Sequence, residues 1–231
     1  PQPIDTARIA PSAVASLVLV PGRENMAQYL RLIPGVPEVV QEDPTLTDLS
    51  WIGDKLSLHF CDGEIIFEID PTLLRPLQVP MLGEASTTWQ ALLSTLLMAT
   101  NMPVYATIDV ENRDKAQRLL EQISQRIFLK QGQLVNIPTK LDAYQLPDYK
   151  QHKMYVLKAQ LHAAVIRLHI ALVVDQLVMA TKPEILREVI YASSQELAAD
   201  PVKAHLMLRL NQRGLNRLRD DVQLYWAEKS R

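Results

Sequence analysis

The sequence predicts an α+β fold, with a largely antiparallel sheet and helices packed on one of its faces. Two observations carry this prediction. One local design occurs three times, in which a short apolar strand leads through a polar turn into an amphipathic helix, at residues 17–33, 104–127 and 177–192. Further segments rich in valine and isoleucine are separated by turn residues, which is typical of antiparallel strands. The fold is therefore predicted to be built from repeated strand–helix units.

The length of 231 residues, 48% of them hydrophobic, suits one large domain or two small ones. We interpret residues 1–231 as a single α+β domain. The order of elements is similar in residues 1–102 and 103–231, so two pseudo-duplicated halves remain the alternative, although no residue-level repeat relates them.

The first elements are an extended arm at residues 1–11, which contains three prolines, and a buried strand at residues 14–20, which is β-branched and apolar. A Pro21-Gly22 turn follows. The next apolar residues recur at the spacing of one helix face, namely Met26, Tyr29, Leu30 and Ile33. This segment gives the helix of the first strand–helix unit.

Residues 56–69 predict a β-hairpin, because Asp62-Gly63 favours a two-residue type I′ turn. Pairing outward from this turn gathers six apolar side chains on one face: Leu56, Leu58, Phe60, Ile65, Phe67 and Ile69. The other face carries Ser57, His59 and Cys61, and we expect it to face solvent, as in a sheet that is covered on one side.

The middle of the chain predicts a helix at 89–99, a strand at 104–108 and a second helix at 115–127, which Asp109 or Asn112 would cap. Residues 131–150 are polar and contain prolines. We interpret them as a long surface connection, a common place for binding.

Residues 154–161 and 164–174 fit either two strands or one long helix. We favour strands, because valine and isoleucine cluster there. A strand at 177–180 follows, and Thr181 is expected to cap a helix at 183–192 that has proline and glutamate in its first turn.

The last elements are a strand at 205–210, which places Leu206, Leu208 and Leu210 on one side, and a final helix. The apolar stripe of that helix consists of Leu215, Leu218, Val222 and Tyr225.

Residues 170–186, with the sequence IALVVDQLVMATKPEIL, resemble an uncharacterised family of bacterial extracytoplasmic α+β domains. The shared pattern is a hairpin followed by Ala-Thr-x-Pro-Glu-x-Leu at the start of a helix. The resemblance implies a secreted or periplasmic bacterial protein of unknown function. It supplies no catalytic residues.

Composition argues against several functions. The net charge of −2 gives no general attraction to nucleic acid. No apolar run reaches the roughly 20 residues of a transmembrane helix. The single cysteine, Cys61, excludes an intramolecular disulfide and a zinc site with two cysteine ligands. No GxSxG, HExxH, P-loop or GxGxxG pattern occurs.

Ordinary structural roles account for the titratable residues. His59 and Cys61 could form a nucleophile pair on one strand face, but a polar outer face explains them more simply. His162 and His169 are seven positions apart, which disfavours a shared metal ion whether the segment is a helix or a strand. His152 is interpreted as a solvated loop residue and His205 as a residue on the polar face of a strand edge. Two charged clusters are interpreted as solvated surface: Asp62, Glu64, Glu68 and Asp70; and Arg209, Arg213, Arg217 and Arg219. We therefore assign no catalytic, cofactor-binding or metal-binding residue.

The function that we expect is a non-enzymatic extracytoplasmic bacterial domain that binds a protein partner or serves in an envelope assembly. The chain begins with Pro1, and we expect a signal peptide or one membrane anchor upstream. The alternative is an enzyme or small-ligand binder whose site consists of scattered residues. A cytoplasmic adaptor is the third interpretation.

Overall fold

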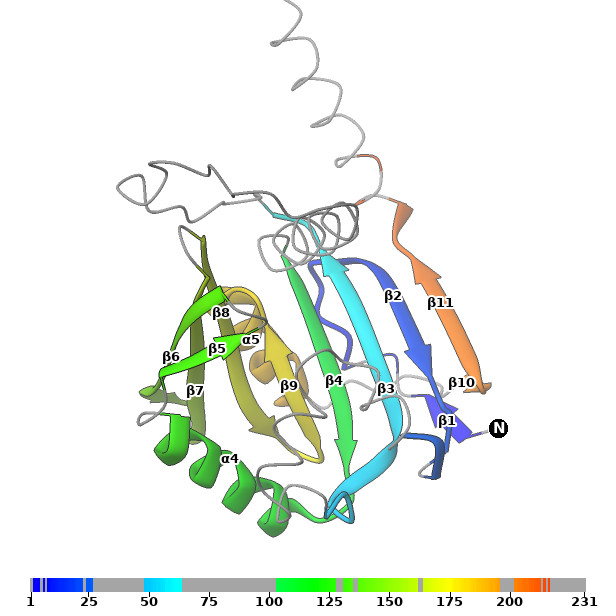
Figure 1. Cartoon of the computed structure of the whole chain (residues 1–231). Coiled ribbons are helices and arrows are strands. Elements are labelled where there is room, and N and C mark those ends of the chain that lie inside the picture. Colours follow the sequence, from blue (N-terminus) through cyan, green and yellow to red (C-terminus); the bar gives the residue numbers. More distant parts are fainter. Residues whose placement is uncertain are drawn as a thin grey trace, which may run out of the picture.

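The structure is a computed structural model, and it describes most of the sheet and two helices (Figure 1). The described residues are 2–4, 6, 8–22, 24–26, 48–63, 103–127, 131–134, 137–161, 164–195, 202–212, 214 and 216.

One antiparallel sheet of nine strands organises the described residues. In spatial order its strands are β11 (Leu206–Leu210), β2 (Ala13–Leu19), β3 (Ile52–Cys61), β4 (Val104–Val110), β9 (Gln176–Ala180), β8 (Ala164–Val173), β7 (His152–Leu161), β6 (Ile137–Tyr149) and β5 (Gln131–Leu134). A second sheet pairs β1 (Gln2–Ile4) with β10 (Val202–Ala204). The helices whose bounds lie within the described residues are α4 (Arg113–Ile127) and α5 (Pro183–Ser193).

The α+β class and the antiparallel sheet are confirmed. The strands predicted at 14–20, 104–108, 154–161, 164–174, 177–180 and 205–210 form to within a few residues, as do the helices at 115–127 and 183–192. The choice of two strands over one helix for residues 154–174 is therefore correct.

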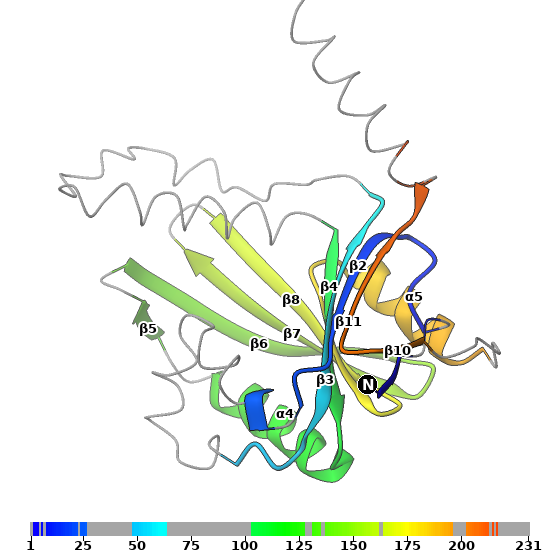
Figure 2. The same ribbon diagram turned by 90° about the vertical axis from the view of Figure 1, so that its right-hand side faces the viewer.

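The prediction that the helices pack on one face of the sheet is wrong. Figure 2 shows α4 and α5 on opposite sides. Neighbouring residues of β9 belong to different cores, because Val178 packs with the α5 residues Leu186 and Ile190, whereas Leu177 packs with the α4 residue Leu120. The central strands are apolar on both faces, so each face needs a cover.

The prediction that residues 131–150 form a surface connection is also wrong, since they form β5 and β6. Polar residues suit β6 because part of it faces solvent, as the exposed Tyr144 shows. Pro147 is tolerated because it lies where the register with β7 shifts, between Leu146 and Tyr149. Proline removes a ladder hydrogen bond, so strands accept it at such irregularities.

The predicted hairpin at residues 56–69 conflicts with the position of β3. Both edges of β3 are occupied, and Leu58 lies opposite Leu17 of β2 on one side and Ala106 of β4 on the other. No edge of β3 is left for residues 64–69, which lie outside the described residues. The polar side chains expected to face solvent are buried: Ser57, His59 and Cys61. The N-terminal arm and the α5 core cover that face.

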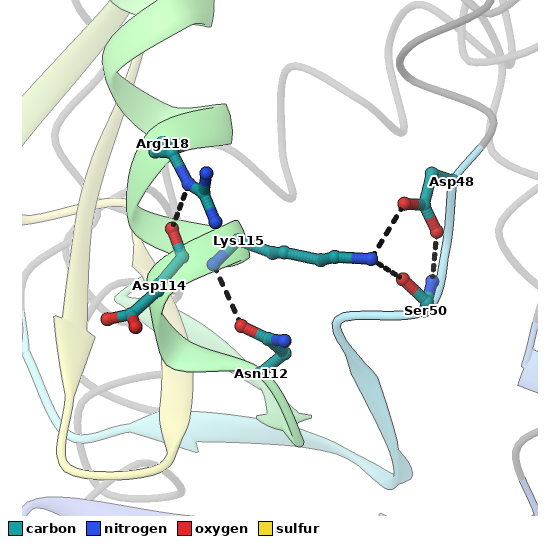
Figure 3. Close-up of polar contacts among 6 residues, drawn as sticks. All are labelled: Asp48, Ser50, Asn112, Asp114, Lys115 and Arg118. Atoms are coloured by element: carbon teal, nitrogen blue, oxygen red, sulfur yellow. Dashed lines mark hydrogen bonds and ion pairs between the residues drawn. The ribbon is translucent and has the colours of Figure 1, made fainter.

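The N-terminus of α4 is fixed by side chains from two places in the sequence (Figure 3). Asn112 Oδ1 accepts a hydrogen bond from the Lys115 backbone N–H at 3.0 Å, which confirms the second of the two predicted caps. Lys115 Nζ reaches Asp48 at 3.0 Å and Ser50 Oγ at 2.7 Å. The bonds from Ser50 and Lys115 lower the pKa of Asp48 to about 2. These contacts connect α4 to the chain that enters β3.

The start of α5 differs from the prediction. The residue that precedes the helix is Lys182, and it makes no side-chain capping bond. The Thr181 hydroxyl, expected to cap this helix, is bonded to the backbone of Val104 in β4 instead. Pro183 and Glu184 occupy the first turn as expected.

Three predicted helical segments lie outside the described residues in whole or for the most part, namely 26–33, 89–99 and 215–225. The division into halves at residues 1–102 and 103–231 stays a prediction.

Candidate functional site

A small polar pocket lies on the face of the sheet that α5 and the N-terminal arm cover. Its volume is about 70 Å³. The arm contributes Ile4, Arg8 and Ile9. The strands β3 and β4 supply most of the polar lining, with Lys55, Ser57, His59, Tyr105, Thr107 and Asp109. Because side chains alternate along a strand, these odd-numbered residues share one face.

A chain of hydrogen bonds crosses from β4 to β3 in this pocket. Thr107 Oγ1 and Ser57 Oγ lie 2.6 Å apart, and Ser57 Oγ lies 2.6 Å from His59 Nε2. The His59 ring stacks on Tyr105, with centroids 4.2 Å apart and planes inclined by 14°. Tyr105 Oη accepts a hydrogen bond at 2.9 Å from the backbone N–H of Ala10, which lies in the arm.

Burial keeps His59 neutral. It lowers the pKa of His59 to about 4, and the positive charge of Arg209 acts in the same direction. His59 Nδ1 is buried, and no group among the described residues forms a hydrogen bond with it. An unpaired acceptor costs less than an unpaired N–H. The tautomer with the proton on Nε2 is therefore favoured, and it donates to Ser57.

The outer end of the pocket is charged but internally paired. Lys55 Nζ lies 3.1 Å from Asp109, which also accepts a hydrogen bond from Gln176 Nε2 at 3.2 Å. Arg8 of the arm donates to Asp175 at 2.6 Å. Burial raises the pKa of Asp109, and Lys55 opposes that rise. These charges satisfy each other and do not converge on an empty space.

The turn beside this charged end is strained. Val174, which joins β8 to β9, has a φ of 55°. This left-handed conformation is unfavourable for a β-branched residue. Its carbonyl accepts a hydrogen bond from Arg113, and the carbonyl of Asp175 accepts one from Val110 N–H at 2.7 Å. The turn is therefore held by neighbouring elements on three sides, since Arg8 binds it as well.

The Ser57–His59 pair is poorly suited to nucleophilic catalysis. A histidine with a pKa of about 4 is a weak base at neutral pH. In a catalytic triad a third group binds the other ring nitrogen, whereas no described residue binds His59 Nδ1. A volume of about 70 Å³ is also far below the roughly 300–1,000 Å³ of ordinary small-molecule pockets.

Of the other titratable residues considered in the sequence as site candidates, none whose side chain is described lines this pocket. Cys61 is buried on the same face of β3, but it lies outside the pocket lining, and burial raises the pKa of its thiol to about 11. His169 is buried in β8. His152 is the first residue of β7, and its Nδ1 lies 3.0 Å from the carbonyl of Leu172 in β8. His205 and Arg209 are exposed. The side chains of some weighed residues are not described: His162, Glu64, Glu68, Asp70, Arg213, Arg217 and Arg219.

The described residues contain neither a metal-binding cluster nor a membrane-spanning helix. No three histidine, cysteine, aspartate or glutamate side chains in the described part of the chain are grouped so that they could hold a metal ion. No helix in that part has both the length and the apolar character needed to span a membrane.

A second feature is an apolar surface on the edge strand β11. Three leucines point to one side of this strand and are largely exposed: Leu206 at 59%, Leu208 at 62% and Leu210 at 56%. Within the described ranges, β11 pairs only with β2, so its outer edge carries no partner strand. Figure 1 shows β11 at the end of the sheet.

The apolar surface continues from β11 onto its neighbours. Leu206 and Leu208 lie opposite Leu19 and Leu17 of β2. These in turn lie opposite leucines of β3. The β2 and β3 side chains in this row are partly buried. We call the three exposed leucines together with Leu17 and Leu19 the β11 apolar face.

The sequence indicated parts of both features. Alternation placed the three leucines on one side of a strand, but edge position depends on sheet order, which no local pattern encodes. The arm was expected to be extended, but nothing in it indicates that it covers Ser57 and His59. The pairing of Arg8 with Asp175 joins residues 167 positions apart.

Comparisons with protein-family models, curated proteins and solved structures gave no match to this chain. The fold and the two surface features define an α+β domain with an antiparallel sheet, a small paired polar pocket and an apolar sheet edge.

Proposed function

We propose that this chain is a non-enzymatic binding domain that docks a protein partner on the β11 apolar face. The observation that carries the proposal is the exposure of Leu206, Leu208 and Leu210 on a strand whose outer edge is unpaired among the described residues. Natural proteins usually protect an edge strand with charges, proline or a bulge. β11 has one charged residue, Arg209, and its side chain lies on the opposite side from the leucines.

An edge of this kind suits recognition by strand addition. The unpaired N–H and C=O groups of β11 can bond to an added strand, while the leucines give the contact its apolar component. Scattered apolar side chains are normal on a surface, but a contiguous row indicates an interaction site. The charged end of the pocket offers fewer groups to a ligand, because Lys55, Asp109 and Gln176 already bond to each other.

We also propose that the domain is extracytoplasmic and bacterial and that it works in an envelope assembly. The support is the resemblance of residues 170–186 to exported domains. In this chain that segment forms the end of β8, then β9 and the start of α5, a hairpin followed by a helix. Reading the gene upstream of Pro1 tests the location, because export by this route requires a signal peptide or an anchor there.

Photo-crosslinking in the native host tests the partner. A photoreactive amino acid replaces Leu208 in one strain and Tyr191 in a matched control, since Tyr191 is 51% exposed and lies on α5, which packs on the opposite face of the sheet from the leucine row. We expect ultraviolet light to produce a discrete protein adduct at Leu208 and none at Tyr191. The absence of adducts at positions 206, 208 and 210 alike would contradict partner binding through this face.

The alternative function is an enzyme or small-ligand binder, and the 2.6 Å contact between Ser57 and His59 in a pocket is the observation that favours it. A fluorophosphonate probe tests it, because such probes label activated serines. We expect no labelling of Ser57 in the folded protein. Labelling that is lost in Ser57→Ala and in His59→Gln would replace the binding proposal with a hydrolytic one.

We propose further that β4–α4 and β9–α5 are two copies of one repeated strand–helix unit. Each begins as an apolar strand and leads within a few residues into a helix that packs on the sheet. The proposed third copy begins with β2.

A further inference from the structure

We propose that the partner of the β11 apolar face is a second copy of this chain, which pairs antiparallel with β11 about a twofold axis at Leu208. This inference rests on the proposed function, since it names the partner of the same face. In this arrangement Leu208 lies opposite its own copy, and Leu206 lies opposite Leu210 of the second copy. A twofold contact of this kind uses the same surface on both molecules.

The side-chain pattern of β11 suits self-pairing. Its five residues alternate, with Leu206, Leu208 and Leu210 on one side and Met207 and Arg209 on the other. Antiparallel pairing at Leu208 therefore places leucine against leucine on the exposed side. On the other side each arginine lies opposite a methionine, so like charges do not meet directly, which would be destabilising.

The surroundings of β11 favour the same contact. Arg209 Nη1 donates to the Thr6 carbonyl of its own chain at 3.4 Å, which directs its charge toward the arm. On the leucine side, the surface continues into Leu17 and Leu19 of β2, so pairing joins two β11 apolar faces into one. The β1–β10 sheet takes the preceding chain away from the edge, as Figure 2 shows.

The contact is small. It consists of two five-residue strands and their leucines. The surface area that such a contact buries is smaller than the roughly 800 Å² per partner of a standard stable interface. We therefore expect a weak dimer whose population depends on protein concentration, as is typical of small interfaces. Measurements at several protein concentrations are required to detect it.

Single-cysteine crosslinking of the purified chain tests the register. Residues opposite each other in an antiparallel pair have Cα atoms about 4.5–5.5 Å apart, within the range of a disulfide. Leu208→Cys is therefore expected to form a disulfide dimer under mild oxidation about tenfold faster than a Tyr191→Cys control. The unmodified chain serves as a second control, because Cys61 is buried.

Two further variants make the test specific. Leu206→Cys and Leu210→Cys each lie about 14 Å from their own copy in this register, as four residues of strand separate them. Each alone should crosslink slowly, whereas an equimolar mixture of the two should crosslink about half as fast as Leu208→Cys, because half of its dimers combine the two variants. Equal rates for the mixture and the separate variants, or no excess of Leu208→Cys over Tyr191→Cys, would overturn the dimer.

Sedimentation equilibrium provides an independent measurement. The unmodified chain should show concentration-dependent dimers, Leu208→Lys should be monomeric, and Tyr191→Lys should behave like the unmodified chain. A monomer at all concentrations, together with a host adduct at Leu208 whose added mass differs from this chain, would overturn the second copy and leave the proposed function standing. No adduct and no dimer would overturn both.

Discussion

The side chain of Thr181 clamps the backbone of Val104, because its Oγ1 accepts a hydrogen bond from Val104 N–H at 3.0 Å and donates one to the Val104 carbonyl at 3.1 Å. The Thr181 backbone N–H also donates to that carbonyl at 2.9 Å. The clamp lies where β9 ends, just before α5 begins. One hydroxyl therefore joins the start of β4 to the chain that leads into α5.

Thr181→Val should lower the free energy of unfolding by about 1–3 kcal/mol, because it removes the side-chain acceptor of the part-buried Val104 N–H and one of the two donors to the Val104 carbonyl, while it preserves side-chain shape. Urea denaturation measures the change. Lys182→Ala is the matched control. Lys182 is the residue before α5, and it makes no side-chain capping bond. A Thr181→Val variant as stable as Lys182→Ala would contradict the clamp.

Val174→Asn should raise the free energy of unfolding by about 1 kcal/mol, because asparagine tolerates the left-handed conformation that valine resists. The side chain of Val174 is 42% exposed, so little packing is lost. Urea denaturation again supplies the measurement. Val174→Ile keeps the β-branch and should bring no gain. If Val174→Asn proved no more stable than Val174→Ile, backbone strain at this turn would be the wrong explanation.

Stability should fall as the pH is lowered from about 6.5 toward 4, because of His59. Its folded pKa of about 4 lies below the ordinary histidine pKa of 6.5. The unfolded chain therefore binds a proton in this range while the folded chain does not, and this favours unfolding. The part of the free energy of unfolding that depends on neutral His59 is fully present above pH 6.5. Its loss at lower pH amounts to at most about 3 kcal/mol.

His59→Gln isolates this contribution. Asp109, whose folded pKa is raised, titrates with the opposite sign, so the unmodified chain alone gives a mixed profile. His169 acts in the same direction as His59. We expect the unmodified chain to lose more stability than His59→Gln between pH 7.5 and about 4.5, as measured by urea denaturation at each pH. Parallel pH profiles would show that His59 is not kept neutral by burial.

Gly53→Ala should destabilise the fold by about 1–3 kcal/mol through overpacking. A Cβ at this position would lie 2.7 Å from Asp109 Cβ and 3.2 Å from the Asp109 backbone. Gly63→Ala is the control, since its nearest neighbour, Pro103 Cβ, would lie at an ordinary 3.4 Å. Thermal unfolding of both variants measures the difference. Equal midpoints would show that β3 and β4 have room to separate at Gly53.

Local patterns predicted the elements of this fold better than their arrangement. Hydrophobic periodicity and turn residues located β2, β4, β7, β8, β9, α4 and α5. Local patterns did not predict the order of the strands in the sheet, because β3 pairs with β2 and β4 across long stretches of sequence. The Asp62-Gly63 turn signal suggested a local partner for a strand whose edges are both filled by distant ones. Polar composition likewise concealed β6, whose alternation is weak because two prolines interrupt it.

In the candidate site too, the sequence predicted which residues share a strand face but not what covers that face. The sequence placed His59 and Cys61 on a common face of one strand, and that relationship holds. It assigned the face to solvent because its residues are polar. Ala10, which bonds to Tyr105, and Ile9, which lines the pocket, belong to a segment without regular structure. Burial by such a segment leaves no periodic signal in the sequence.

The strands β4 and β9 separate two apolar layers, and this has a consequence for engineering. A substitution on α4 or α5 perturbs the layer that its helix covers, whereas a backbone shift in β4 or β9 reaches both layers at once. Amide protons of these two strands should accordingly exchange with solvent among the slowest in the molecule. Redesign of one layer should therefore begin on its helix, and the sequences of β4 and β9, which contribute to both layers, should be kept unchanged.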